Sequence, residues 1–264
     1  MTTDNKTIAA RLAALRDEMR REHLSAFIFP SSDPHNSEYV PPRWEGRKWI
    51  SGFDGSAGTA VVTLHSAALW TDSRYFLAAE EQLAGTEFQL MRERMEGTPG
   101  IAEWIAAGLS DDDSTEIGVD GMCMTYADVS DLKTELKHNG GITVRTNLDI
   151  LDRVWTDRPS VPLNPVRIQP LEYAGESCRD KLGRIRSSLL RRGAGGILMT
   201  QLDDIAWTLN LRGTDVHCTP VFVAWLIVAE EVAVLYIKDD KLSPEVIDYL
   251  HAEGVAVDDY DNII

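Results

Sequence analysis

A proline-rich stretch divides this sequence into two parts. Four of the chain's 11 prolines, at positions 159, 162, 165 and 170, fall within the fourteen residues 157–170. Proline fixes φ and lacks a backbone N–H, so this stretch cannot continue a helix or a central strand. We expect an extended linker here, with one domain over residues 1–157 and a second over residues 158–264.

The same order of predicted elements occurs on both sides of this linker: helix, strand, polar loop, two adjacent strands, helix, strand. In the first half these elements are Thr7–Glu22, Ser25–Phe29, Thr59–Thr63, Ala67–Thr71, Phe76–Leu83 and Phe88–Arg92. In the second half they are Cys178–Arg192, Gly196–Met199, Phe222–Val228, Val232–Ile237, Pro244–His251 and Val255–Val257, with an added helix Leu202–Leu209 after the first strand. Both halves therefore predict an α/β unit with a mixed sheet flanked by helices.

The first half then continues where the second stops. The further predicted elements of the first half are Ile101–Leu109, Glu116–Val119, Thr125–His138, Ile142–Arg145 and Leu148–Trp155, with Thr125 as a helix cap. The second half has no counterpart of them, so we expect its domain to be smaller or truncated.

The charge balance excludes some classes of partner. The chain has 42 acidic and 26 basic residues, a net charge of −16. Nucleic acids and anionic membranes favour the opposite sign, so we expect neither as a partner. The longest apolar run, Val221–Ala229, is half of what a membrane span needs. With three scattered cysteines and no apolar N-terminal segment, the sequence predicts a cytoplasmic protein.

Searches for catalytic motifs return no complete set. The sequence contains no HExxH motif, no Cys/His pattern with zinc spacing and no P-loop. None of these motifs therefore predicts a catalytic residue, a metal ligand or a cofactor site.

Four segments are nevertheless richer in polar or small residues than packing requires. In the loop Ser31–Tyr39, His35 and Glu38 can act as an acid–base pair, although Asx and Ser turns explain the loop better. In Trp49–Thr59, three glycines allow close backbone approach, and a tight connection into the next strand is the favoured interpretation.

The other two segments contain charged residues at the ends of elements. Asp72 and Arg74 follow a strand, where Arg74 can bind a carboxylate or carbonyl, or pair with Asp72. Asp203 and Asp204 resemble a metal pair, but a helix cap is favoured. Arg212, Asp215 and His217 lie in the loop after that helix, where an ion pair is the simplest expectation.

Taken together, five segments closely resemble the long, three-domain form of Xaa-Pro aminopeptidase (aminopeptidase P), from about Leu12 to the C-terminus. They are Pro30-Ser-Ser-Asp-Pro-His-Asn-Ser-Glu-Tyr39, Ile50-Ser-Gly-Phe-Asp-Gly-Ser-Ala-Gly-Thr-Ala60, Leu69-Trp-Thr-Asp-Ser-Arg-Tyr-Phe76, Ile150-Leu-Asp-Arg-Val-Trp-Thr-Asp-Arg-Pro159 and Leu202-Asp-Asp-Ile-Ala-Trp-Thr-Leu-Asn-Leu-Arg-Gly-Thr-Asp215. Several ordered motifs in one chain are far more specific than any single one.

The resemblance implies two creatinase N-terminal-like domains, followed in the family by a pita-bread metallopeptidase domain with two divalent metals, usually manganese. Such enzymes remove the N-terminal residue from peptides with proline in second position. This chain lacks the third domain, so the resemblance implies an N-terminal fragment that is inactive alone, with no catalytic residue, metal ligand or cofactor of its own. Its expected partners are the C-terminal catalytic domain of the parent protein and, in the intact enzyme, proline-containing peptides, and a homodimer is left open.

The resemblance also gives some residues a role. It places Arg74 in the substrate site, and we expect His35, Asp72, Arg212, Asp215 and His217 to face that site or the missing domain. The alternative is a natural stand-alone binding or dimerisation module.

Overall fold

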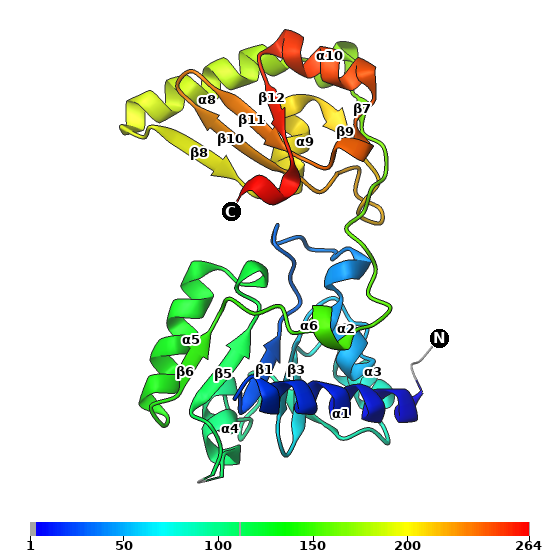
Figure 1. Cartoon of the computed structure of the whole chain (residues 1–264), viewed down its shortest axis with the longest axis vertical. Coiled ribbons are helices and arrows are strands. Elements are labelled where there is room, and N and C mark those ends of the chain that lie inside the picture. Colours follow the sequence, from blue (N-terminus) through cyan, green and yellow to red (C-terminus); the bar gives the residue numbers. More distant parts are fainter. Residues whose placement is uncertain (1–3, 111, 264) are drawn as a thin grey trace. The chain divides into compact units, whose positions relative to one another are not determined.

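The computed structural model describes residues 4–110 and 112–263, which form two compact units (Figure 1). The first unit contains the residues up to Pro34 together with Pro42–Pro159. The second contains His35–Pro41 and the residues from Ser160 onward. The short segment His35–Pro41, which lies inside the predicted range of the first domain, thus packs with the second unit.

The first unit is built on a six-stranded mixed sheet with the order β4-β3-β2-β1-β5-β6. Its strands are β1 (Ala26–Phe29), β2 (Thr59–Thr63), β3 (Ala67–Thr71), β4 (Phe88–Arg92), β5 (Glu116–Val119) and β6 (Thr143–Arg145). The pairs β1–β2 and β2–β3 are antiparallel, whereas β3–β4, β1–β5 and β5–β6 are parallel. Strand β1 therefore lies inside the sheet, with a partner on each side.

Helices pack on both faces of this sheet. The α-helices are α1 (Asn5–Arg21), α2 (Gly46–Ser51), α3 (Phe76–Gln82), α4 (Ile101–Gly108), α5 (Tyr126–His138) and α6 (Leu151–Val154); single 3₁₀ turns occur at η1 (Pro42–Trp44) and η2 (Gly121–Cys123). Thr125 caps α5 as predicted, because its hydroxyl accepts a hydrogen bond from the backbone N–H of Asp128.

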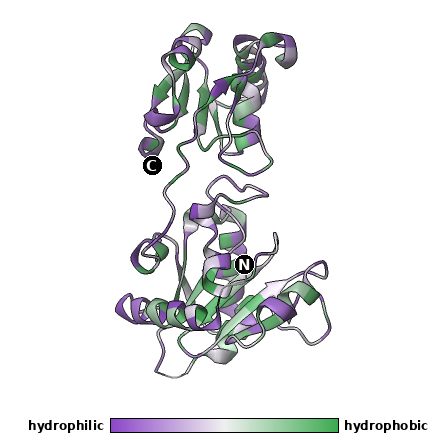
Figure 2. Ribbon diagram, turned by 90° about the vertical axis from the view of Figure 1, so that its right-hand side faces the viewer, coloured by the Kyte–Doolittle hydropathy of each residue, from purple (hydrophilic) through white to green (hydrophobic). Residues whose placement is uncertain are grey.

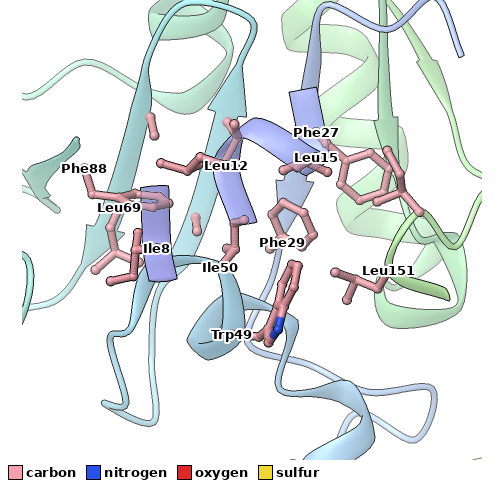
Figure 3. Close-up of a cluster of buried hydrophobic side chains, with 14 of the residues drawn as sticks. Ile8, Leu12, Leu15, Phe27, Phe29, Trp49, Ile50, Leu69, Phe88 and Leu151 are labelled. Carbon is pink, nitrogen blue, oxygen red and sulfur yellow. The ribbon is translucent and has the colours of Figure 1, made fainter. Parts of the chain in front are cut away.

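The side chains of β1 alternate between the two faces of the sheet and are buried on both. Phe27 and Phe29 belong to one apolar cluster with the inner face of α1 (Figure 3). Ala26 and Ile28 belong to the cluster on the other face, which contains residues of α4 and α5. This alternation follows from the two-residue period of a strand and explains why β1 reads as a continuous apolar run.

The second unit has a smaller sheet with the order β12-β11-β10-β8. Its strands are β8 (Gly196–Met199), β10 (Trp225–Ala229), β11 (Ala233–Tyr236) and β12 (Ala256–Asp258), and the short strands β7 (Arg167–Ile168) and β9 (Leu211–Arg212) pair separately. Its helices are α7 (Leu171–Ala174), α8 (Cys178–Arg192), α9 (Leu202–Leu209) and α10 (Pro244–Glu253), with 3₁₀ turns η3 (Asp239–Lys241) and η4 (Tyr260–Ile263). Hydrophobic stretches in both units concentrate on strands and on one side of helices (Figure 2).

The predicted α/β class, with a mixed sheet and flanking helices in each unit, is confirmed. One expected cap is wrong, because α9 begins after Gln201 and places Asp203 and Asp204 within its first turn. There, both carboxylates still interact favourably with the helix dipole. None of the helices within the described residues is long and apolar enough to cross a membrane.

Candidate functional site

Asp72 and Arg74 meet at the end of strand β3, as one of the two interpretations predicted. The Asp72 carboxylate accepts hydrogen bonds from Arg74 Nε at 2.9 Å and Arg74 Nη2 at 2.7 Å. It also accepts one from the backbone N–H of Arg74 at 3.0 Å, which fixes the turn into α3. The Arg74 side chain is nevertheless 66% exposed, so the pair restrains the guanidinium without burying it.

This geometry determines the protonation state of Asp72. The side-chain hydrogen bonds from Arg74 lower the pKa of the Asp72 carboxyl to about 2, and the backbone N–H of Arg74 acts in the same direction. Asp72 therefore remains a carboxylate over the whole physiological range, and Arg74 keeps its partner.

The guanidinium of Arg74 also packs against an aromatic ring. The Arg74 Cζ atom lies 5.2 Å from the centre of the Tyr75 ring, a cation–π distance. The Tyr75 hydroxyl is 2.7 Å from Ser56 Oγ, and its ring meets Phe53 edge-on at 6.0 Å. Tyr75 is thus held by the glycine-rich loop that precedes β2.

The glycines of this loop are required by close contacts. A Cβ atom at Gly55 would lie 2.4 Å from the Phe53 ring and 2.8 Å from the Tyr75 ring, closer than real Cβ contacts allow. The Asp54 and Gln82 side chains bond to each other at 2.7 Å, which ties the loop to α3. The predicted tight connection is therefore also a support for the Arg74 turn.

Arg47 is a second guanidinium in this region, and sequence reasoning missed it. It is buried, lies 4.9 Å from the Phe53 ring, and donates a hydrogen bond to the Gly55 carbonyl. Burial lowers its pKa to about 10, so it stays charged at neutral pH. Nothing in its sequence context, Glu45-Gly-Arg-Lys48, distinguishes it from an exposed arginine.

His35 lies in the second unit and is buried. Its Nδ1 is 3.0 Å from the Thr200 carbonyl, and its Nε2 is 2.9 Å from the Tyr260 hydroxyl. A carbonyl only accepts, so Nδ1 bears a proton, and in the neutral ring Nε2 accepts from the Tyr260 hydroxyl. Both ring nitrogens have partners, and the ring packs against Trp225 with the ring centres 4.3 Å apart and the planes tilted by 43°. This network favours a structural role over the acid–base role considered with Glu38.

The residues after His35 line a cavity of about 260 Å³ at the start of α9. Glu38 and Tyr39 form one wall, and Asp203 and Thr219 contribute to others. The remaining lining residues are His35, Asn36, Ser37, Gln201, Leu202, Val216 and Val221.

Arg212, Asp215 and His217 do not converge on one point. Arg212 donates to the Ala206 carbonyl of α9 at 3.0 Å, and His217 is exposed in the turn closed by a bridge between Val216 and Thr219. Asp215 is buried and forms its ion pair with Lys241, not with Arg212. Asp215 also accepts a hydrogen bond from the Val223 N–H at 2.7 Å.

Lys241 also fixes the linker to the second unit. Its ammonium donates to the Pro162 carbonyl at 3.2 Å, and its own carbonyl accepts from the Val166 N–H at 2.9 Å. Burial lowers the pKa of Lys241, while Asp215 opposes that shift. In the sequence Asp239-Asp-Lys241 this lysine resembles a solvated charge, so no sequence signal predicts its role.

The described residues also lack a metal-binding cluster. Across residues 4–110 and 112–263, no group of three or more His, Cys, Asp or Glu side chains is placed to hold an ion.

Comparison with known proteins identifies the family. Residues 11–149 match the profile of the Creatinase/Prolidase N-terminal domain, and residues 157–264 match a second profile of the same description. The chain belongs to the creatinase/prolidase N-terminal domain family. The expected resemblance to Xaa-Pro aminopeptidase is also confirmed, by sequence and by structure.

Two fungal relatives are 39% identical to the chain. A probable Xaa-Pro aminopeptidase P of Aspergillus niger matches over 254 residues, which are 96% of this chain and 41% of the relative. A probable Xaa-Pro aminopeptidase P of Neosartorya fischeri matches over 264 residues, 100% of this chain and 39% of the relative. The chain thus spans about two fifths of the length of these relatives.

A solved enzyme structure likewise matches nearly the whole of this chain. The X-prolyl aminopeptidase of Caenorhabditis elegans, described as a cytosolic enzyme with a di-nuclear active site, superimposes with a TM-score of 0.89 at 30% identity. The match covers 97% of this chain and 43% of that enzyme.

The Asp72–Arg74 pair makes a prediction about titration. The Asp72 carboxyl should titrate near a pKa of 2. Arg74→Ala removes the side-chain donors but keeps the backbone N–H, so the pKa should rise toward 3.8 without reaching it. The stabilisation from this depressed pKa is present above pH 3.8 and is lost as the pH falls through about 2. NMR titration of the carboxyl measures this, with Arg92→Ala, which removes a partner of Glu80, as the control.

The buried pair makes a prediction about stability. Lys241→Met leaves the Asp215 carboxylate buried without its counter-ion and should lower the free energy of unfolding by about 3–5 kcal/mol. Lys238→Met removes a lysine that pairs with Asp259 and Asp261 near the surface and should cost about 1 kcal/mol or less. Denaturant unfolding compares the two variants, and equal losses would contradict this interpretation.

Proposed function

We propose that this chain is the N-terminal, non-catalytic region of a metal-dependent Xaa-Pro aminopeptidase. The parent enzyme would remove the N-terminal residue from peptides that have proline in second position. Support comes from relatives and a solved structure with that activity in their names, each of which matches nearly the whole chain but is more than twice its length. We propose a cytoplasmic location, as for the enzyme of Caenorhabditis elegans.

In this proposal the catalytic centre lies in the rest of the parent enzyme. A C-terminal catalytic domain would hold two divalent metals, manganese by family resemblance, which activate water and polarise the scissile carbonyl. The present residues would contribute to the substrate site and to contacts with that domain or with a second copy.

The observation that carries the substrate role is the restrained, exposed guanidinium of Arg74. Asp72 and Tyr75 hold it at a strand end, yet two thirds of the side chain is exposed. A guanidinium offers five donors in a planar fork, which suits the carbonyls and the carboxylate of a short peptide. Because its direction is fixed before binding, less conformational entropy is lost when the peptide is oriented for cleavage.

One prediction of this proposal concerns the 264-residue chain alone. Supplied with manganese and an Xaa-Pro peptide, it should release no N-terminal amino acid above the uncatalysed background. Release of that amino acid can be measured by chromatography. Turnover by the purified chain would refute the non-catalytic assignment.

Another prediction of this proposal concerns Arg74 in the parent enzyme. Arg74→Ala should lower kcat/KM for short Xaa-Pro peptides by about 10–100-fold, the loss expected for a charge-assisted hydrogen bond. Arg74→Lys keeps the charge without the fork and should recover only part of it. Arg92→Ala serves as a matched control with unchanged kinetics, and unchanged kinetics for Arg74→Ala would reject its substrate role.

The alternative, a stand-alone binding or dimerisation module, differs from the proposed function in what it predicts for the reading frame of the gene. A reading frame that stops after residue 264 would support the module. A frame that continues into a metal-ligand set would support the aminopeptidase.

A further inference from the structure

The guanidinium of Arg47 is buried, yet it makes little use of its hydrogen-bonding capacity. The residue is 8% exposed, and its Nη2 donates to the Gly55 carbonyl. Among the residues that the structure describes, Nε and Nη1 of Arg47 have no hydrogen-bond partner. A buried charge with unmet donors costs stability, whereas an apolar side chain of similar volume would not. Packing alone therefore does not account for an arginine at this position.

The hydrogen bond from Arg47 holds the glycine-rich loop against two aromatic rings. A Cβ atom on Gly55 would collide with the rings of Phe53 and Tyr75, so the loop backbone lies directly against both. The Arg47 guanidinium itself lies 4.9 Å from the centre of the Phe53 ring. The Ser51 hydroxyl also donates to the Arg47 carbonyl at 2.7 Å and accepts from the Phe53 N–H at 3.1 Å. Arg47 is thus joined to both Phe53 and Gly55.

Phe53 in turn contacts Tyr75, the ring against which Arg74 packs. The Phe53 and Tyr75 rings meet edge-on with their centres 6.0 Å apart. The Tyr75 hydroxyl is 2.7 Å from Ser56 Oγ in the same loop, and the Arg74 Cζ atom lies 5.2 Å from the centre of the Tyr75 ring. A continuous series of contacts therefore runs from Arg47 through the loop to Arg74.

The charge of Arg47 also attracts the loop. Burial lowers the pKa of Arg47 to about 10, while the nearby charges of Glu45 and Asp54 oppose that shift. Arg47 is therefore a cation at neutral pH and attracts the Asp54 carboxylate, which accepts a hydrogen bond from the Gln82 side chain of α3 at 2.7 Å. An apolar residue at position 47 would keep the packing but lose this attraction and the hydrogen bond to Gly55.

We infer that Arg47 is a positioning residue for Arg74: it holds the glycine-rich loop, and with it Tyr75, so that the exposed guanidinium is directed before a peptide binds. This inference rests on the proposed function, in which Arg74 contacts the substrate. Because Arg47 is buried, it acts through Arg74 and not by contact with the peptide. A guanidinium that is already directed loses less conformational entropy on binding, so a looser Tyr75 should weaken the contribution of Arg74 while the fold survives.

The first test uses the 264-residue chain and requires no activity. Arg47→Met keeps most of the volume but removes the charge and the donor to Gly55. The order parameter of the Arg74 Nε–H bond, measured by ¹⁵N relaxation, should fall from about 0.8 to below about 0.6. The midpoint of thermal unfolding should change little, because the desolvation cost of the buried charge is lost together with its hydrogen bond.

Two further variants of Arg47 make this test independent of one substitution. Arg47→Gln ends about where Nε lies, so it cannot reach the Gly55 carbonyl and should give the same fall in the order parameter. Arg47→Lys keeps the charge and a single donor and should recover part of the order. An Arg74 side chain that stays fully ordered in Arg47→Met or in Arg47→Gln would overturn the inference.

Arg11 provides a matched control in the same unit. Its guanidinium also lies 4.9 Å from the centre of an aromatic ring, that of Trp49 in α2, and it donates to the Trp49 carbonyl at 2.6 Å. The Trp49 ring stacks on Trp155, with the ring centres 5.2 Å apart. Arg11→Met therefore removes the same kinds of contact from α2 without interrupting the series that leads to Arg74. The Arg74 Nε–H bond should remain as ordered as in the unchanged chain.

The second test is a double-mutant cycle in the parent enzyme. Arg47→Met should lower kcat/KM for short Xaa-Pro peptides by about 10-fold, and it should cause no further loss when Arg74→Ala is already present. A residue needed only for folding would cause the same loss in both backgrounds, so additive losses would contradict the inference. If the parent enzyme cleaves no Xaa-Pro peptide while Arg47→Met still loosens Arg74 in the 264-residue chain, the proposed function alone is refuted.

Discussion

The parallel pairing of β1 with β5 is the contact on which the first unit depends. It places β1 inside the sheet, so that successive side chains enter the core on both faces, and Phe27, Ile28 and Phe29 are each worth about 1.5–3 kcal/mol when fully buried. Gly118 makes the pairing possible, because a Cβ atom there would lie 2.6 Å from the Phe27 ring. Helices α1 and α5 pack on the two faces of the sheet to which β1 contributes its side chains.

Local signals made most of the fold predictable. Helix α8 and its cap Ser177 could be predicted because a Ser before an amphipathic run satisfies backbone donors that would otherwise be unpaired. Helix α2 was missed because its six residues are too few for a period to emerge. Helix α6 is shorter than the predicted Leu148–Trp155, since Asp149 turns the chain just before Leu151.

The candidate site likewise contains local contacts, which the sequence could predict, and long-range contacts, which it could not. The Asp72–Arg74 pair joins residues two apart, so sequence reasoning could propose it directly. The partners of His35 are 165 and 225 residues away, and Lys241 is 26 residues from Asp215. Only the folded chain brings such groups together, and burial then decides their chemistry. A histidine that could act as an acid or base, and a lysine that resembles a solvated charge in the sequence, are both buried in the second unit and bonded there.

The internal repeat also shows which residue of the second unit takes the position of Arg74. The pairing of Ala60 with Leu69 matches that of Leu226 with Leu235. Counting onward from these pairs, Arg74 corresponds to Asp240, and Tyr75 corresponds to Lys241. The exposed Asp240 thus takes the position of Arg74, whereas the buried Lys241, paired with Asp215, takes that of Tyr75. The two strand ends therefore differ in chemistry: one carries an exposed guanidinium restrained by Asp72 and Tyr75, and the other carries a buried ammonium that contacts the Pro162 carbonyl.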